Sequence, residues 1–159
     1  MRYVKGTPMY GVGHDLNVRG LSLSKPPYGR LSAIDLNRGD ILWQTPHGDM
    51  PDRVQRHPAL AGLDVPRTGE PCAGLVGPLV TRTLVIMGEC SYHAMPGGQR
   101  GAMLRAYDKA TGARVGAFYM PAPQSGSPMT YMLDGRQYIV LAISGGAYSG
   151  EYLALALPE

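Results

Sequence analysis

Two stretches with the same spacing decide the fold: residues 33–43, AIDLNRGDILW, and residues 106–116, AYDKATGARVG. Alanine, aspartate and glycine stand at the same relative positions in both, whereas the tryptophan that closes the first stretch is replaced by Gly116 in the second. Self-similarity of this kind is the sequence signature of an architecture built from repeated units. We therefore expect two copies of one structural unit, of which the second lacks its final aromatic side chain.

Each position of the first copy has a physical role in a hairpin. Ala33 is small enough to let neighbouring sheets approach, and the Asp35 carboxylate can accept hydrogen bonds from backbone N–H groups in the turn. Gly39 supplies the left-handed backbone conformation that such a turn needs. Trp43, at a strand end, can lie flat against the next sheet while its indole N–H donates to a backbone carbonyl. The spacing thus predicts a hairpin whose tryptophan joins one sheet to the next.

Short apolar runs around the two copies predict further antiparallel strands. The expected pairs are 31–35 with 40–44, 103–107 with 113–119, and 129–133 with 137–143. Asp134 and Gly135 separate the last pair and form the strongest short-range hairpin signal. Runs 76–81 and 83–87 are apolar at nearly every position, so we expect both to be central strands covered on both faces. Residues 152–157 predict one more strand.

The composition agrees with an all-β protein. With 22 glycines, 14 prolines and only 17% charged residues, the 159-residue sequence is rich in turns and poor in the residues that fill long helices. Its length suits one domain with a hydrophobic core. Residues 1–30 predict an irregular approach segment, residues 45–75 a surface insertion and residues 89–101 a second irregular loop, all set against the repeated β units of 31–159.

The charge and hydropathy patterns favour neither a nucleic-acid-binding protein nor a membrane-spanning helix. A formal net charge of +3 with scattered Lys and Arg gives no electrostatic footprint for nucleic acid. No apolar run approaches the ~20 residues of a membrane helix, and residues 1–10 lack the pattern of a signal peptide. Cys72 and Cys90 match no metal-binding spacing, and the sequence does not settle whether they form a disulfide.

Three short motifs suggest a site only superficially. His47, Asp49 and His57 lack the spacing of a metal site and lie in a polar stretch, so we expect a solvated loop. Residues 91–93, Ser-Tyr-His, have no Gly-x-Ser-x-Gly elbow that would indicate a hydrolase. Residues 11–15 lack the third glycine and the βαβ setting of a dinucleotide-binding fingerprint.

The repeat resembles the tryptophan-docking motif of the dehydrogenases that depend on pyrroloquinoline quinone (PQQ). Further stretches follow the order seen near the C-terminus of the membrane-bound glucose dehydrogenase and quinate/shikimate dehydrogenase branch, namely residues 27–35, 77–81, 104–112, 126–131 and 135–140. The resemblance runs from about residue 26 to 158 and implies the C-terminal blades of an eight-bladed β-propeller, with four-stranded antiparallel sheets, here incomplete. Gly116 and the long loop 89–101 depart from the family pattern.

The resemblance also implies a function. The chain would be the C-terminal portion of a PQQ-dependent sugar or alcohol dehydrogenase and would form part of the wall of the PQQ pocket. Calcium is expected beside PQQ, but the calcium ligands and the catalytic aspartate belong to earlier blades, so neither a catalytic nor a metal-binding residue is assigned here. The chain by itself is expected to be inactive and either poorly soluble or partly disordered, because an open stack of blades leaves unpaired edges.

Partners and compartment follow from the same resemblance. The implied partners are the remaining blades, a small sugar or alcohol, and ubiquinone or a cytochrome as electron acceptor. The implied location is the periplasm or the periplasmic face of the inner membrane. A non-catalytic propeller scaffold of the kind used in outer-membrane assembly shares the docking repeat and stands as the alternative function.

Two stretches match positions that contact the cofactor in the family. The candidate cofactor-binding residues are Leu75 and Gly77 before the innermost strand, and Gly145, Gly146, Ala147 and Tyr148 in a loop that resembles the family's Gly-Gly-aromatic or Gly-Gly-His loop. Glycine marks places where a ligand approaches the backbone closely, but a glycine pair is also an ordinary strand exit. Leu75 can equally be plain core, and the loop register decides whether Ala147 or Tyr148 takes the place of the family's larger side chain.

Overall fold

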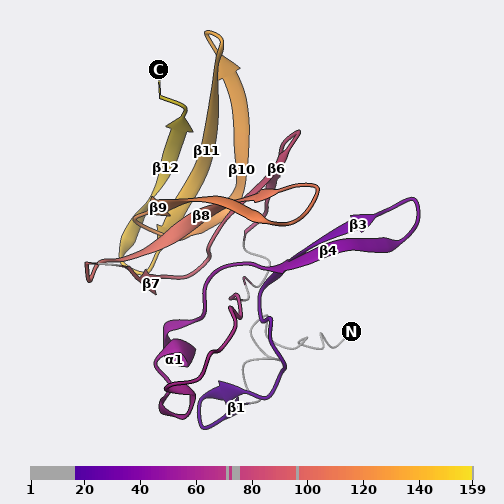
Figure 1. Ribbon diagram of the computed structural model, residues 1–159. Helices are drawn as coiled ribbons and strands as arrows, with labels where there is room; N and C mark the ends of the chain where they lie inside the picture. The colour runs from indigo at the N-terminus through magenta and orange to yellow at the C-terminus, as the bar shows by residue number, and fades with distance from the viewer. Residues whose placement is uncertain (1–16, 71, 73–75, 96, 159) are drawn as a thin grey trace, which may run out of the picture.

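The computed structural model describes residues 17–158 apart from 71, 73–75 and 96, and it is almost entirely β-structure (Figure 1). The strands are β1 (Asn17–Val18), β2 (Leu21–Ser22), β3 (Arg30–Asp35), β4 (Asp40–Pro46), β5 (Leu79–Val80), β6 (Leu84–Gly88), β7 (His93–Ala94), β8 (Arg100–Asp108), β9 (Arg114–Met120), β10 (Gln124–Leu133), β11 (Arg136–Gly145) and β12 (Tyr148–Ala156). One short helix, α1 (Asp52–Gln55), and a 3-10 turn, Pro58–Leu60, complete the described elements. The expectation of an all-β protein is confirmed.

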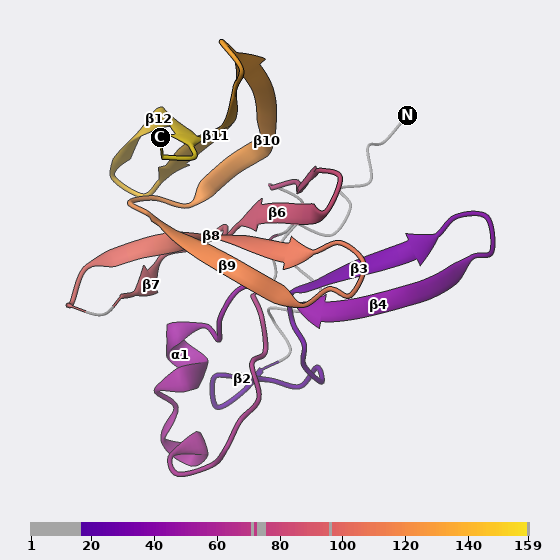
Figure 2. The same cartoon turned by 45° about the horizontal axis from the view of Figure 1, so that its top comes forward.

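Three antiparallel sheets carry the body of the molecule (Figures 1 and 2). The first is the β3–β4 hairpin, the second has the order β5-β6-β8-β9 with β7 paired to the start of β8, and the third has the order β10-β11-β12. All three predicted hairpins are present. Between β10 and β11, Asp134 and Gly135 both have positive φ, at 50° and 77°, as the turn prediction requires.

The expectation of two central strands at 76–81 and 83–87 is only half right. β6 lies between β5 and β8, and four of its five residues are buried. β5 is two residues long and ends the second sheet among the described residues, so Val80 keeps 57% of its surface exposed. Apolar composition alone does not distinguish a central strand from an apolar strand at the edge of a sheet.

The two sequence copies are the same structure. Ala33 pairs with Trp43 across the first hairpin, and Ala106 pairs with Gly116 across the second, each next to a shift in register. The glycines at the fourth position after the aspartate both have left-handed φ, 75° and 72°. The Asp35 carboxylate accepts from Asn37 N at 2.9 Å, and the Asp108 carboxylate accepts from Thr111 N at 2.8 Å. The predicted roles of the shared aspartate and glycine are therefore observed.

Trp43 connects the first sheet to the second. Its indole N–H donates to the carbonyl of Lys109 at 2.9 Å, and its ring covers Gly112, where an added Cβ would lie 2.5 Å from a ring carbon. The predicted contact between neighbouring sheets is thus confirmed, and Gly112 is glycine both for its backbone angle and for the space that the ring occupies.

The hydrophobic core lies between the second and third sheets. It consists of seven buried residues from five segments: Ile86, Ala102, Leu104, Met120, Ala122, Leu141 and Ile143. The β3–β4 hairpin, in contrast, projects away from this core (Figure 2). It exposes Ile34, Leu36 and Leu42, with Leu36 exposed to 90%.

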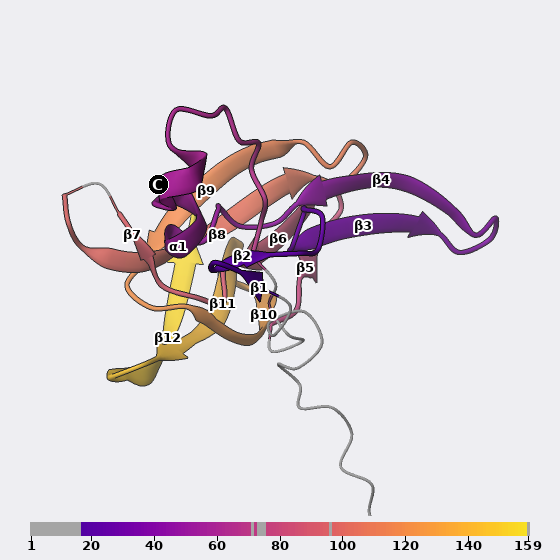
Figure 3. The ribbon, with the colours of Figure 1, turned by 90° about the horizontal axis from the view of Figure 1, so that it is seen from below.

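Residues 47–70 cover one side of the second sheet, and α1 lies near β7 (Figure 3). Ala94 N–H donates to the Asp52 carboxylate at 3.4 Å. Where this segment returns to β4, Gly69 has φ 63° and packs so tightly against the carbonyls of Gly29 and His47 that no side chain would fit. Within the described part of the chain, none of the helices is long and apolar enough to span a membrane.

Candidate functional site

Gly145 and Gly146 open onto a cleft of about 540 Å³ between the second and third sheets. Its lining consists of Cys90, Ser91, Tyr92, Arg100, Pro123, Gln124, Ser125, Ser144, Gly145 and Gly146. The cleft therefore combines the loop after β6, the connection from β9 to β10, and the end of β11. Two of the six candidate residues named from sequence lie directly in this lining.

The other candidates lie elsewhere. Leu75 falls outside the described residues. Gly77 does not line the cleft but is hydrogen-bonded to Gln124, which does. The Gly77 carbonyl accepts from Gln124 Nε2 at 2.8 Å, and the Gly77 N–H donates to Gly126 O at 3.1 Å. Ala147 is exposed in the turn after Gly146, and the Tyr148 hydroxyl donates to the Glu151 carboxylate.

The glycine loop owes part of its shape to Tyr92. Gly145 and Gly146 have φ of 149° and 56°, and the Tyr92 hydroxyl donates to the Gly145 carbonyl at 2.8 Å. A Cβ on Gly145 would lie 3.3 Å from the Tyr92 ring and 3.4 Å from Pro123, whereas one on Gly146 would lie 3.7 Å from the same ring. Gly145 is therefore closely packed, and Gly146 has more space beside it.

Sequence reasoning did not identify Tyr92 or Arg100. Arg100 Nη2 donates to the Tyr92 carbonyl at 3.2 Å, and its guanidinium lies 5.9 Å from the centre of the Tyr92 ring. Both residues border an irregular loop with no periodicity, so only the departure of loop 89–101 from the family pattern could have drawn attention to them. The close approach of this loop to the end of β11 is a tertiary contact that no local signal reveals.

Gln124 joins the strands that meet behind the cleft. Its side-chain oxygen accepts from Gly88 N at 2.6 Å, while its amide nitrogen donates to Gly77 O at 2.8 Å and to Gly126 O at 2.7 Å. Because Gln124 is buried, these bonds satisfy groups that have no access to water. One side chain therefore fixes the Gly77 stretch and the start of β10 relative to β6.

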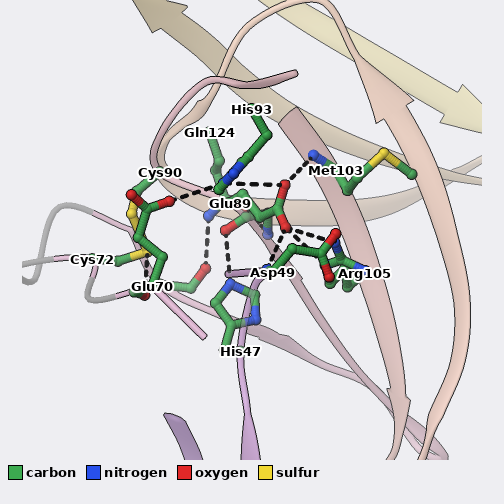
Figure 4. Close-up of a disulfide and its surroundings, with 12 residues drawn as sticks. His47, Asp49, Glu70, Cys72, Glu89, Cys90, His93, Met103, Arg105 and Gln124 are labelled. Carbon is green, nitrogen blue, oxygen red and sulfur yellow. Dashed lines mark hydrogen bonds and ion pairs between the residues drawn. A yellow bond between two sulfur atoms is a disulfide. The ribbon is translucent and has the colours of Figure 1, made fainter. Parts of the chain in front are cut away.

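A disulfide anchors the loop that carries Tyr92 (Figure 4). Cys72 and Cys90 are bonded with their Cα atoms 5.5 Å apart, which answers the question that the sequence left open. The bond ties the end of segment 47–72 to the residue that follows Glu89. The disulfide at Cys90 therefore restrains the backbone only two residues before Tyr92.

A buried ion pair lies beside the disulfide (Figure 4). Glu89 Oε1 accepts from Arg105 Nε at 3.0 Å and Nη2 at 2.7 Å, and Arg105 Nη2 also donates to Asp49 at 2.6 Å. Glu89 Oε2 accepts from Met103 N at 2.8 Å, so both carboxylate oxygens are satisfied. Burial opposes the charge on Arg105, but the Glu89 and Asp49 carboxylates outweigh it and raise the pKa of Arg105. This cluster fixes the first residue of loop 89–101.

His47 contradicts the expectation of a solvated loop, because only 2% of its surface is exposed. Its Nε2 lies 3.1 Å from Gly88 O and its Nδ1 lies 3.0 Å from the Tyr107 hydroxyl. A carbonyl can only accept, so Nε2 carries the proton and Nδ1 accepts from Tyr107. Burial lowers the pKa of His47. His57 lies elsewhere, 2.8 Å from Arg19 O, so the two histidines do not form a cluster.

His93 links the covering segment to the same region. Its Nε2 lies 2.9 Å from Glu70 Oε2 and 3.9 Å from Glu89 Oε2, although the geometry toward Glu70 is not that of an aligned hydrogen bond. The Glu70 carboxylate raises the pKa of His93 above its usual value, against the opposing effect of burial. Among the described residues, no group of three His, Cys, Asp or Glu side chains could hold a metal ion.

The first and second sheets contain hairpins with the same register, and the indole of the first hairpin packs on the second sheet. This arrangement is that of consecutive blades in a β-propeller protein. Residues 2–139 match the family described as glucose/ethanol/alcohol dehydrogenase, β-propeller domain (PQQ). The chain belongs to this family.

The chain is also similar to dehydrogenases whose names identify them as quinone-dependent or as quinoproteins. A probable quinate dehydrogenase (quinone) of Xanthomonas campestris pv. juglandis is 35% identical over 98% of the chain. Quinoprotein glucose dehydrogenase A of Acinetobacter calcoaceticus is 29% identical over 96%, and the quinate/shikimate dehydrogenase (quinone) of Acinetobacter baylyi is 30% identical over 98%. The chain spans 19% of the length of each of these relatives.

The cleft residues are compatible with PQQ, a planar aromatic tricarboxylate. Gly146 leaves its peptide edge open, since an added Cβ would be in no closer contact than 3.7 Å. Arg100 is the one Asp, Glu, Lys or Arg in the described lining, so the cleft has a positive charge and no opposing carboxylate. An open peptide edge and a cation are what a flat, anionic group requires.

Proposed function

We propose that this chain is the C-terminal part of a PQQ-dependent dehydrogenase of sugars or alcohols, and that Gly145 and Gly146 form part of the wall of the PQQ pocket. When bound, PQQ supplies a quinone that takes two electrons and two protons from an alcohol group, which becomes a carbonyl. The observation that carries the proposal is the cleft of about 540 Å³ onto which both glycines open, in a chain of this family.

The residues of this chain have a positioning role in the proposal. The Tyr92 hydroxyl holds the Gly145 carbonyl at 2.8 Å, and the Cys72–Cys90 disulfide holds the loop that carries Tyr92. Gln124 fixes the Gly77 stretch against β6 at the back of the cleft. A wall whose groups are held by covalent and buried hydrogen bonds keeps its shape before the cofactor arrives, which lowers the entropic cost of binding.

The remaining blades are the main proposed partner. The first sheet has two strands and leaves Leu36 90% exposed, and in the third sheet Tyr152 of β12 is 81% exposed. Apolar surfaces of this kind mark contacts with further protein. The family resemblance supports the rest of the proposal. It implies a calcium ion and a catalytic aspartate in the earlier blades, ubiquinone or a cytochrome as electron acceptor, and a periplasmic location.

The test uses the full-length polypeptide that contains this chain and measures PQQ affinity by equilibrium dialysis. Gly146→Leu places a side chain at the wall, and Gly135→Leu is the matched control, because both glycines have positive φ and no atom closer than 3.7 Å to an added Cβ. We expect the dissociation constant for PQQ to rise at least about tenfold for Gly146→Leu, as a loss of roughly 1.4 kcal/mol requires, and to change little for Gly135→Leu.

Equal PQQ affinity in the two variants would overturn the assignment of the wall. The outcome for the unchanged protein separates the two candidate functions. If it binds no PQQ in the presence of calcium, the dehydrogenase proposal fails, and the alternative of a non-catalytic scaffold, which shares the docking repeat, is favoured.

A further inference from the structure

The cleft beside Gly145 and Gly146 has a positive charge whose bound group the proposed function does not identify. Arg100 is the one acidic or basic side chain, histidine included, in its described lining. Glu89, which precedes Cys90 in the lining, does not cancel this charge, because it is 2% exposed and its two oxygens accept from Arg105 and Met103. The cleft therefore presents an unneutralised guanidinium to whatever enters it.

The geometry of Arg100 suits a ligand. The Tyr92 carbonyl accepts from Nη2 at 3.2 Å and the Tyr92 ring lies under the guanidinium at 5.9 Å, so the side chain is oriented from one side. Within the described part of the chain, the Tyr92 carbonyl is the one acceptor of its N–H groups. A guanidinium in this state matches a carboxylate, whose two oxygens it can bind side by side.

Three serine hydroxyl groups belong to the same cleft as the cation. Ser91, Ser125 and Ser144 line the same cleft, and their side chains can each donate to or accept from the hydroxyl groups of a polyol. One cation among neutral hydroxyls fits a monocarboxylate that also carries hydroxyl groups better than it fits a phosphate dianion, which needs more positive charge.

We propose that Arg100 gives this cleft a binding subsite for a carboxylate group, with Tyr92 as the residue that positions the guanidinium. The inference rests on the proposed function, since it concerns the same cleft. The carboxylate can come from two sources, a polyhydroxy acid substrate such as quinate or PQQ itself. Loop 89–101 carries Tyr92 near its start and Arg100 near its end, and it is one of the two places where the chain departs from the family pattern.

The experiment measures three affinities on the full-length polypeptide that contains this chain: for PQQ by dialysis, and for quinate and glucose by calorimetry on the PQQ-loaded protein. Arg100→Gln removes the charge, and Arg38→Gln is the control, because Arg38 is 75% exposed on the β3–β4 turn, where it pairs with Asp40. We expect Arg100→Gln to weaken carboxylate binding about tenfold at low salt, because an exposed charge-assisted bond is worth about 1.5 kcal/mol.

The three affinities identify the source. A loss confined to quinate assigns the subsite to the substrate, and a loss confined to PQQ assigns it to the cofactor. Arg100→Lys should restore part of the affinity, since it keeps the charge but not the paired N–H groups. Tyr92→Phe keeps the ring under the guanidinium but loses the hydrogen bond to the Gly145 carbonyl, so it should weaken quinate binding less than Tyr92→Ala, which removes both contacts.

Unchanged affinities for both quinate and PQQ in Arg100→Gln would overturn the subsite. That result is distinct from failure of the dehydrogenase proposal, because the unchanged protein would still bind PQQ. Glucose affinity serves as the internal reference, since a neutral sugar gains little from the charge. A loss of glucose binding equal to that of quinate would also count against a carboxylate subsite and indicate a general change in the cleft.

Discussion

The two junctions between neighbouring sheets hold together differently, although the first and second sheets share one repeat. At the first, Trp43 spans the gap, packs on Gly112 and donates to Lys109. At the second, the equivalent position is Gly116, and the third sheet is instead joined through the apolar core and Gln124. A repeat can thus lose its aromatic clamp where buried side chains from the facing strands take over its role.

The second junction also carries the cleft. Glu89 O accepts from Gln124 N at 2.9 Å, so the residue that begins loop 89–101 is bonded to the first residue of β10. The loop then supplies Tyr92 to the end of β11. Neither β3 nor β4 of the first junction contributes to the described lining of the cleft. The loss of the indole at Gly116 and the long loop 89–101 therefore both belong to the second sheet and the segment that leads into it.

The largest loss of stability is expected when the buried ion pair between Glu89 and Arg105 is removed. Glu89→Ala leaves Arg105 buried with only Asp49 as a counter-ion, and the loss of one partner of a buried pair costs about 3–5 kcal/mol. Urea unfolding should show a decrease of this size. Arg38→Ala, which breaks the exposed Arg38–Asp40 pair, should change stability by less than about 1 kcal/mol and serves as the control. Similar losses in both variants would contradict a structural role for the Glu89 cluster.

A smaller effect is expected at the first junction. Trp43→Ala should cost about 2 kcal/mol, less than the 3–5 kcal/mol typical of a fully buried tryptophan, because Trp43 is only partly buried. Trp43→Phe keeps part of the packing but loses the bond to Lys109 O, for about 1 kcal/mol. Hydrogen exchange should then rise in β3 and β4 and stay unchanged in β10–β12. Equal exchange in all three sheets would contradict a local clamp.

The smallest effect concerns the covering segment and depends on pH. The pKa of His93 is raised in the folded state by Glu70, so the stability from this pair is complete below about pH 6.5 and is lost as the pH rises through the folded-state pKa. The pKa of His47 is lowered by burial, so its effect has the opposite sign: stability is lost as the pH falls below about 6.5.

His93→Gln removes the first contribution and leaves the second. The variant should therefore lose more stability on acidification from pH 8 to pH 5 than the unchanged protein does, and the two should converge at the alkaline end. Urea midpoints across this range measure the difference. Parallel profiles for the two proteins would show that the His93–Glu70 pair does not contribute to the pH dependence.

Local patterns were sufficient for the repeated units. Asp35, Gly39 and Trp43 act within or just beyond one hairpin, so their spacing predicted the turn, the backbone angle and even the indole bond. Asp134 and Gly135 predicted the β10–β11 turn for the same reason. The ordered motifs also predicted the family, because they lie in strands and turns whose positions are set by short-range rules.

The tertiary structure decided what happens between distant segments. It buried His47, paired Cys72 with Cys90 and brought Tyr92 and Arg100 to Gly145, and none of these contacts has a periodic signal in the sequence. It also left β5 at an edge of the described sheet although its sequence is apolar. The sequence by itself determined the hairpins and their docking tryptophan, since these depend on neighbouring residues. The cleft and its charge depend on loops that meet only after the sheets have packed, and therefore only the fold could place them.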